Sequence, residues 1–569
     1  KAPCKPLVDK KDPHQTLRAR VRSGPFGLRF LSMKSTDVKK GSAPPIEPKS
    51  QAGGDLVFLV NKVVYQETLQ CPKLGWHRRR RLVQSALTEA EALLARQGEE
   101  IESTFLSSRY GDNVLEIEPN SLRQQAADTA TAMRGVASHF KKEVPGTKNG
   151  VAVTQATFIH GECVARADAV EYVGDDQWDV LEVKSCTDKN HLKYLTDLAF
   201  TVHAAMESGV KVRCALMVVI NSDFRLGMDD DAIFKVLNCT EDLFKPDGPI
   251  ATLQGGITDR TSLPYVAQVT SEACAPAGVL TPSCKQCPLF RDCVPPSIQY
   301  PIWHLPRLTG KRFDQVAAHS LDILQVENDL LTVPQQKHRR CVVEGVPVIR
   351  RKGLRKGLNA LQAPLYFLDF ESFSSWRPTL PDQPPLEQVV SQYSLHESAA
   401  LDIDDPDSLQ HKSFLGTSRG DFRRELLDAM LTDLGDKGSI VVYSPYEKTQ
   451  LSKMASLFPD RQDELEALIA RLVDLEPLIR QNVQHPDFQG RTSLKVTLPV
   501  LVPSYVGRYK ALNINNGALA AAAFQRIRGG ELSEEEEATV RAELLEYCKL
   551  DTLAMVELLL ALRRLADEN

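Results

Sequence analysis

The sequence predicts a multi-domain α/β protein, and three observations lead to that prediction. With 569 residues the chain exceeds the size at which one hydrophobic core is usual, so two or three domains are expected. Two separate regions each combine short apolar strand patterns with longer segments whose apolar residues recur at helical spacing. Charged residues make up 25% and hydrophobic residues 42% of the chain, which is the balance of an ordinary globular protein.

Residues 1–53 differ from the rest of the chain. They are rich in Lys, Arg, Ser, Pro and Gly and hold few acids, a composition that cannot bury enough surface to fold. We expect a disordered basic segment, which could be a linker, an expression remnant or an organellar presequence. The protein is therefore expected to be intracellular, either cytoplasmic or, if the segment is a presequence, organellar.

The bulk numbers exclude some classes and leave others open. No run of 18 or more apolar residues occurs, so we expect no membrane span. Twelve cysteines without a secretory signal indicate reduced thiols in an intracellular protein. The net charge of −5 gives no overall basic signal, but a local basic patch could still bind nucleic acid.

The first catalytic pattern lies on two neighbouring strands. Residues 162–173 (ECVARADAVEYV) and 178–186 (WDVLEVKSC) read as strands, and the short loop between them predicts a hairpin. Glu182 and Lys184 share one face, and Asp168 can meet Glu182 across the pair. Two carboxylates that bind Mg²⁺ or Mn²⁺, with a lysine to position water or stabilise charge, suit phosphodiester hydrolysis. The alternative is a surface hairpin with an ordinary Glu–Lys pair.

This pattern resembles the RecB-like branch of the PD-(D/E)xK nucleases, which have a restriction-endonuclease-like core. The resemblance implies that Asp168, Glu182 and Lys184 are the core motif. It also implies a preceding strand at 152–158 and a following helix over 191–206. Relatives often carry Gln and then Tyr on that helix, where this sequence has Thr201 and His203. Upstream, Glu102 is either a further metal ligand or, as we favour, a solvated helical glutamate.

Three clustered cysteines indicate a metal or cluster site. Cys284, Cys287 and Cys293 need a fourth ligand, for which Cys71 is the best candidate and Cys274 the next. The arrangement resembles the iron–sulfur members of the same nuclease branch, which place one cysteine before the core and three after it. That resemblance implies a 4Fe–4S cluster that staples the two ends of the domain together; structural Zn is the alternative.

Two basic stretches accompany these motifs. Arg78, Arg79, Arg80 and Arg81 follow Cys71 and are either a solvated charge run or a phosphate-backbone contact. Residues 301–360 read as short helices and polar turns that end in RRKGLRKGL. We expect them to form a helical connector between a nuclease domain at 54–300 and a second domain at 361–569.

The second domain contains another set of acids. APLYFLDFESF predicts a buried strand with Asp369 and Glu371 on one face, where acids are costly unless they bind something. GSIVVYSPYE predicts a second strand that ends in Glu447. LLEYCKLDTLAMVELLLAL predicts a helix on which Tyr547 and Asp551, four residues apart, lie on the same face.

This set resembles the DnaQ-like 3′–5′ exonucleases of tyrosine type, on an RNase H-like α/β fold. The two strand acids match the first motif, and Tyr547 with Asp551 matches the third. The second motif reads Ser-Pro-Tyr-Glu at residues 444–447, where relatives have an Asn and an Asp. The resemblance implies Mg²⁺ or Mn²⁺ held by both strand acids and Asp551. A further acid, Asp474, is expected to cap a turn or helix rather than bind metal.

From about residue 54 to 569 the chain resembles one uncharacterised family that joins these two nuclease types. The resemblance implies a metal-dependent nuclease with two active centres, acting on DNA more than RNA, in repair, recombination or end processing. No Walker-type loop is found, so a helicase or other repair factor would be a separate partner. The alternatives are a nucleic-acid-binding scaffold whose C-terminal domain is inactive, and an RNA-processing exonuclease.

Overall fold

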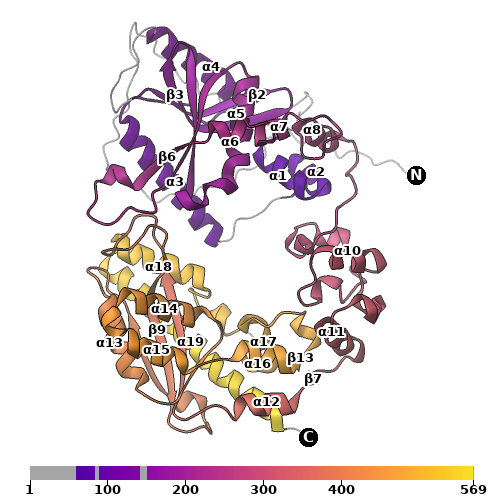
Figure 1. Cartoon of the computed structure of the whole chain (residues 1–569), viewed down its shortest axis with the longest axis vertical. Helices are drawn as coiled ribbons and strands as arrows, with labels where there is room; N and C mark the ends of the chain where they lie inside the picture. The colour runs from indigo at the N-terminus through magenta and orange to yellow at the C-terminus, as the bar shows by residue number, and fades with distance from the viewer. Residues whose placement is uncertain (1–58, 84–88, 141–149, 506, 568–569) are drawn as a thin grey trace, which may run out of the picture.

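The computed structural model describes residues 59–83, 89–140, 150–505 and 507–567. The predicted disordered segment, residues 1–53, lies outside the described residues. Two mixed α/β units are joined by a helical connector, with the N-terminal unit at the top of Figure 1, the connector at the right and the C-terminal unit at the bottom. The predicted multi-domain α/β class is confirmed at this level.

The N-terminal unit is built on a six-stranded mixed sheet whose spatial order follows the sequence. Its strands are β1 (Val114–Glu116), β2 (Ala152–His160), β3 (Cys163–Gly174), β4 (Gln177–Thr187), β5 (Lys211–Ile220) and β6 (Phe234–Asn238). β3 and β4 form the predicted hairpin, closed by a turn in which Gly174, Asp175 and Asp176 have positive φ. Gly and Asp tolerate that conformation. A register shift between Tyr172 and Gly174, next to the turn, sets the pairing of the two motif strands.

The N-terminal unit contains nine described α-helices, and those over residues 89–110, 122–139 and 195–207 pack directly on the sheet. The nine are α1 (Lys62–Gln70), α2 (Pro72–Arg79), α3 (Glu89–Tyr110), α4 (Leu122–His139), α5 (Leu195–Glu207), α6 (Thr240–Phe244), α7 (Pro249–Leu253), α8 (Leu263–Ser271) and α9 (Phe290–Cys293). The helix predicted over 191–206 begins only at Leu195, and residues 188–194 form a 3₁₀ helix. Leu192 is exposed, so no burial favours α-helix there, whereas Leu198 and Val202 are fully buried.

The connector has a small hydrophobic core of its own. Its helices are α10 (Gly310–His319) and α11 (Val333–Glu344), which pack around Trp303, Phe313 and Ile323. A capping box begins α11, and the left-handed Gly345 ends it. The rest of the predicted connector belongs to the C-terminal unit, because β7 (Val348–Ile349) pairs with β13 (Val483–Gln484) and α12 (Arg351–Leu358) buries its leucines in that core.

The C-terminal unit is built on a five-stranded sheet of order β10-β9-β8-β11-β12. These strands are β8 (Leu365–Phe373), β9 (Val389–Ser398), β10 (Gln410–Leu415), β11 (Ser439–Val442) and β12 (Leu472–Asp474). β8 is central, antiparallel to β9 and parallel to β11, so its apolar start is buried as predicted. Its helices are α13 (Arg423–Leu434), α14 (Tyr446–Leu457), α15 (Gln462–Ala470), α16 (Leu475–Asn482), α17 (Leu494–Leu501), α18 (Gly517–Gly529) and α19 (Glu534–Asp567).

One element of the second acidic set differs from prediction. The strand predicted to end in Glu447 ends at Val442, and Glu447 lies in the first turn of α14. Pro445 explains the difference, because proline cannot continue a strand ladder and readily precedes a helix. By contrast, α19 is a continuous helix as predicted, and the four glutamates of its first turn suit the positive end of the helix dipole.

The two α/β units also touch directly. The ring of Trp376 stacks on that of Phe234 with centroids 6.1 Å apart, and Arg377 lies 3.5 Å from Asp230. The N-terminal and C-terminal units are therefore joined in two ways, by the connector and by this direct contact. Within the residues that the structure describes, no helix combines the length and apolar character needed to cross a membrane.

Candidate functional site

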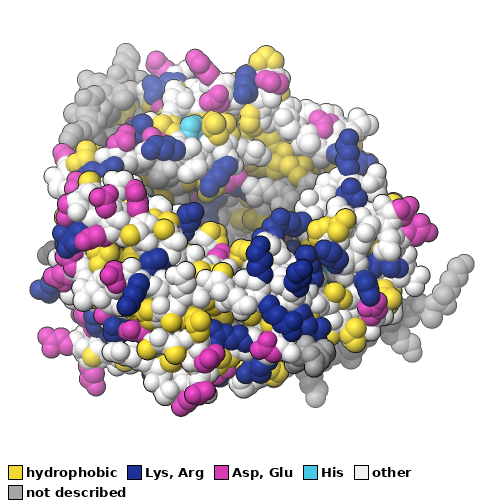
Figure 2. Space-filling model, turned by 60° about the horizontal axis from the view of Figure 1, so that its bottom comes forward, with side chains coloured by type: hydrophobic (Ala, Val, Ile, Leu, Met, Phe, Trp, Pro, Cys, Tyr) yellow, Lys and Arg dark blue, Asp and Glu magenta, His cyan; other side chains and the backbone are white. Residues whose placement is uncertain are grey.

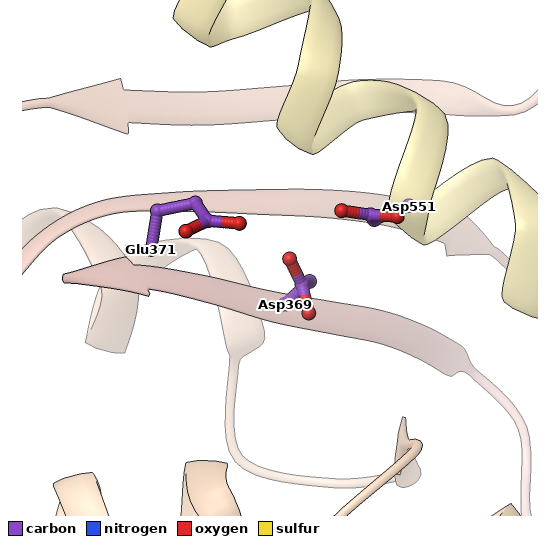
Figure 3. A group of neighbouring side chains, drawn as sticks. All are labelled: Asp369, Glu371 and Asp551. Atoms are coloured by element: carbon purple, nitrogen blue, oxygen red, sulfur yellow. The ribbon is translucent and has the colours of Figure 1, made fainter. Parts of the chain in front are cut away.

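Three carboxylates converge at the centre of the C-terminal unit. Asp369 and Glu371 project from one face of β8, and Asp551 reaches them from α19, which packs across β8 and β9 (Figure 3). One oxygen of each lies within 4.8 Å of the others, and no other group of three His, Cys, Asp or Glu side chains does so among the described residues. The predicted convergence of these three acids is confirmed as geometry.

Burial and mutual repulsion shape the protonation of this acidic centre. Burial, then the charges of Asp551 and Glu371, raise the pKa of Asp369 well above its ordinary value. Burial and Asp551 raise the pKa of Glu371 to about 8. Burial also raises the pKa of Asp551, against hydrogen bonds from Tyr509 and Tyr547. The protein has therefore gathered three acidic groups whose ionisation its own side chains only partly compensate.

Glu447 lies beside the acidic centre but outside the group of three. It is buried and accepts a hydrogen bond of 3.2 Å from the Ser444 hydroxyl. Burial raises its pKa to about 7, and its charge in turn raises the pKa of Asp369. Asp474 accepts a hydrogen bond from the Glu476 amide at the start of α16, so its predicted capping role is confirmed.

Sequence reasoning missed three neighbours of the acidic centre. The Tyr509 hydroxyl donates to Asp551 Oδ1 at 2.7 Å, the Cys548 thiol lies 3.5 Å from Asp369 Oδ2, and the positive charge of Lys495 lowers the pKa of Glu371 and Asp551. Tyr509 begins a 3₁₀ helix of three residues, Tyr509–Ala511, which is too short to carry a periodic signal. Lys495 and Cys548 stand in stretches that supported the resemblance, SLKVTL and YCKLDT, but spacing assigned them no role.

The N-terminal motif also assembles as predicted. The register that pairs Ala169 with Leu181 places Asp168 opposite Glu182, and Asp168 accepts a hydrogen bond of 2.7 Å from the Val183 amide. Lys184 Nζ lies 2.8 Å from Glu182 Oε2. Asp168, Glu182 and Lys184 therefore form one buried site at the end of the hairpin.

Two further residues complete this site from helices distant in sequence. Lys62 on α1 donates to both oxygens of Glu182 at 3.1 Å, and the Thr201 hydroxyl on α5 donates to Oε1 at 2.5 Å. Burial would raise the pKa of Glu182, but Lys184 and Lys62 outweigh it and lower that pKa. No signal in the sequence marked Lys62, because its partner lies in a different element.

The pKa of Asp168 shifts in the opposite direction to that of Glu182. Burial, then the charges of Glu182 and Glu102, raise its pKa to about 8. The interpretation of Glu102 as a solvated glutamate is wrong: it is half-buried, because α3 packs against β4, and it accepts a hydrogen bond from Gln155. Glu102 is therefore a third carboxylate facing this site.

The four predicted cysteines line one cavity of about 280 Å³ between α1–α2 and residues 279–293. Each sulfur accepts a hydrogen bond. The Val279 amide donates to Cys71, the Thr281 amide to Cys284 and the Leu289 amide to Cys287. The Lys73 ammonium donates to Cys293. Cys274 is exposed and does not line the cavity. The sulfurs are not all within 4.8 Å of one another, so they do not form a closed four-sulfur tetrahedron.

The arginine run after Cys71 is largely engaged in internal contacts. Arg78 forms a paired contact with Glu67 at 2.7 Å, and Arg79 is buried against Glu162 and α8. Arg80 donates to backbone carbonyl groups at the end of α8 and stacks on Trp76. Arg78 thus ties α2 to α1, and Arg79 and Arg80 tie α2 to α8. Arg81 is left as the exposed member for the predicted phosphate contact.

Comparison with known proteins places part of the chain among relatives of unknown role. Residues 366–493 match a family described as "Domain of unknown function (DUF2779)", a stretch that holds Asp369, Glu371 and Glu447 but ends before Asp551. The chain is 26% identical over 226 residues to "Uncharacterized protein MG366" of Mycoplasma genitalium, covering 37% of this chain and 34% of that protein. It is 26% identical over 204 residues to "Uncharacterized protein MG366 homolog" of Mycoplasma pneumoniae, covering 33% and 31%.

The chain thus spans about a third of the length of the curated relatives that it matches. No solved structure matches it.

Proposed function

We propose that this chain is a Mg²⁺- or Mn²⁺-dependent nuclease that hydrolyses phosphodiester bonds, in DNA more than in RNA. The observation that carries the proposal is the acidic centre of Asp369, Glu371 and Asp551, in which Asp551 is buried, the other two are partly buried, and the oxygens lie within 4.8 Å of one another. Such a site is unfavourable without a cation, and a donor set made only of carboxylates suits a hard divalent metal. Repair, recombination and end processing, with a separate helicase as partner, are the settings we propose for it.

The residues around the acidic centre support hydrolysis of a phosphodiester. Metal ions bound there would supply an acidified water and neutralise charge on the phosphate. Asp369, Glu371 and Asp551 would hold them, while Tyr509 and Tyr547 fix the orientation of Asp551. Burial and Asp551 raise the pKa of both tyrosines, so they remain protonated donors at neutral pH. The acids on the central strand β8 and the C-terminal helix support an RNase H-like, DnaQ-like identity for this unit.

The N-terminal site supports a second nuclease centre of the PD-(D/E)xK type. Asp168 and Glu182 would offer oxygen ligands, with the charge of Glu102 acting on Asp168, and Lys184 lies 2.8 Å from Glu182, where it would hold a water against the scissile phosphate. Lys62 provides a second positive charge at the same carboxylate. We therefore propose a restriction-endonuclease-like core of RecB-like type for residues 59–300.

We propose a 4Fe–4S cluster, rather than zinc, at the four cysteines. Zinc–sulfur bonds of about 2.3 Å would hold four sulfurs less than about 4 Å apart, whereas these four are not all within 4.8 Å of one another. An iron–sulfur cluster is larger, and N–H donors to each sulfur are the contacts that tune such a cluster. Anaerobically purified protein should be brown and contain iron and sulfide; colourless protein containing zinc would overturn this assignment.

The nuclease proposal is tested with Asp369→Asn, Glu182→Gln and the double variant, using end-labelled single-stranded DNA, duplex DNA and RNA with Mg²⁺ or Mn²⁺. Glu425→Gln, an exposed carboxylate on α13, is the matched control. We expect each single variant to lose one cleavage activity and the double variant to lose both. Cleavage that persists undiminished in the double variant would refute the proposal.

One observation favours a second candidate function. Glu447 stands outside the group of three acids, where the second motif would need a ligand. If Asp369→Asn changes no cleavage while Glu182→Gln abolishes it, the C-terminal unit is an inactive nucleic-acid-binding scaffold. If only RNA is cleaved, and Asp369→Asn abolishes that cleavage, the chain is an RNA-processing exonuclease.

A further inference from the structure

A large basic cavity lies between the connector and the C-terminal unit, apart from both acidic sites. It encloses about 830 Å³ and is bounded by α10, α11, β7, α16 and the loop that precedes α17. Seven Lys and Arg side chains line it, against the single carboxylate of Glu476. The whole chain carries a net charge of −5, so this positive charge is a local feature.

Most of these cations have no carboxylate partner. Within the described ranges no ion pair is formed by Arg307, Arg312, Lys337, Arg350 and Arg491. The other two lining cations, Arg340 and Arg480, pair with glutamates on their own helices. Figure 2 shows Lys and Arg side chains gathered on the right-hand rim of a hollow, the side on which Figure 1 draws α11, α12 and α16.

The interior of the cavity supplies an independent sign of a ligand. His338 on α11 lines it and is only 1% exposed, yet its Nε2 has no hydrogen-bond partner. Burial, followed by His304, lowers the pKa of His338 to about 4, so the ring is neutral at pH 7. A buried polar atom without a partner is costly, and a ligand group in the cavity would satisfy it.

The cavity also lies close to the acidic centre along the chain. Arg491 lines the cavity, and the positive charge of Lys495, four residues later, lowers the pKa of Glu371 and Asp551. Four residues span at most about 14 Å even when fully extended. The backbone of Arg491 in the cavity wall is therefore at most that far from the backbone of a cation that acts on the carboxylates.

We propose that this cavity binds the phosphate backbone of a single nucleic-acid strand and leads it to the acidic centre formed by β8 and α19. The inference rests on the proposed nuclease function for its substrate class. A volume in the range of small-ligand pockets admits one strand but not a duplex. Unpaired arginines and lysines along a groove are the usual means by which proteins hold single strands without regard to sequence.

The test compares two triple variants of the full chain in an Asp369→Asn, Glu182→Gln background, with chelator present so that no strand is cleaved. The cavity variant is Arg307→Gln, Lys337→Gln and Arg491→Gln, all exposed side chains. The control is Arg123→Gln, Lys245→Gln and Arg260→Gln, exposed on the N-terminal unit. Binding of fluorescent 20-nucleotide DNA and RNA strands is measured by anisotropy from about 0.05 to 0.3 M salt.

Each lost phosphate contact should lower the slope of log K against log salt by about 0.7, so the cavity variant should lose about 2. At 0.1 M salt this corresponds to binding weaker by on the order of 100-fold, while the control changes by less than about threefold. Equal loss in both variants, or no loss in either, would overturn the inference. Full competition by inorganic phosphate or a nucleoside triphosphate at stoichiometric concentration would also overturn it, in favour of a small anionic ligand.

Because binding is measured without metal, the result is independent of catalysis. Loss of strand binding in the cavity variant, with no cleavage by the unmodified chain, would sustain this inference and refute the proposed function. Cleavage by the unmodified chain, with unaltered strand binding by the cavity variant, would support the proposed function and refute this inference.

Discussion

Replacing Glu371 by Gln removes one negative charge from the acidic centre while keeping the size of the side chain. Glu371 has a pKa of about 8 in the folded chain and an ordinary value of 4.5 when unfolded. The folded state therefore binds its proton more tightly. The cost to stability is absent below pH 4.5, grows between pH 4.5 and 8, and is complete above pH 8.

The magnitude follows from that shift. Each pKa unit corresponds to about 1.4 kcal/mol, so between pH 5.5 and 8.5 the ionisation of Glu371 should lower the free energy of unfolding by about 3 kcal/mol. In chelator, we expect Glu371→Gln to remove this loss and to be more stable than the unmodified chain at pH 8.5. Excess Mg²⁺ should stabilise the unmodified chain, by about 2.7 kcal/mol at 100 times the dissociation constant, and the variant much less.

The assay must follow the C-terminal unit alone, because a multi-domain chain does not unfold in one step. Hydrogen exchange of peptides from β8, measured by mass spectrometry across a urea series, reports on the strand that carries Glu371. Glu425→Gln, with its exposed carboxylate, should change the free energy of unfolding by less than about 0.5 kcal/mol. Equal pH dependence in the unmodified chain and Glu371→Gln would refute the reasoning, as would the absence of any Mg²⁺ effect.

Three further outcomes follow from the N-terminal unit. Glu182→Gln should remove the strongest ion pair of Lys184 and so lower the pKa of that lysine. Chemical labelling of Lys184 across a pH series should then show faster modification near pH 9. Cys71→Ser should reduce iron and sulfide content to below half and destabilise the unit, as shown by metal analysis and thermal denaturation. Arg79→Gln should lower the free energy of unfolding by about 1–3 kcal/mol, because several hydrogen bonds between α2 and α8 are lost. Hydrogen exchange of α8 peptides across a urea series measures this value, and an unchanged value would contradict the prediction.

Local pattern decided the elements that carry the acids. The apolar run before Asp369 predicts a central strand, and the periodicity around Asp551 predicts a long helix, because burial of one face imposes spacing on the sequence. The same alternation placed Glu182 and Lys184 on one face of their strand. The turn predicted the hairpin, but a register shift between Tyr172 and Gly174 in the folded chain sets Asp168 opposite Glu182.

Boundaries and cross-element contacts were less accessible to sequence. The prediction that Glu447 ends a strand was wrong, because a short turn that contains Pro445 follows β11 and Glu447 lies in α14. The prediction that Glu102 is solvated was wrong, because the local sequence does not reveal which face of α3 packs against β4. Lys62 and Tyr509 gave no signal, since each acts through a partner far away in the chain.

The sequence by itself therefore determined which residues could serve as ligands and on which secondary-structure elements they lie, because periodicity is a property of neighbouring residues. Only the tertiary structure decided that Asp551 meets the β8 acids, that four cysteines line one cavity, and that unpaired arginines from the connector face α16. These outcomes depend on how helices and strands pack across long separations, where the free energy comes from burial of surfaces that no short stretch of sequence contains.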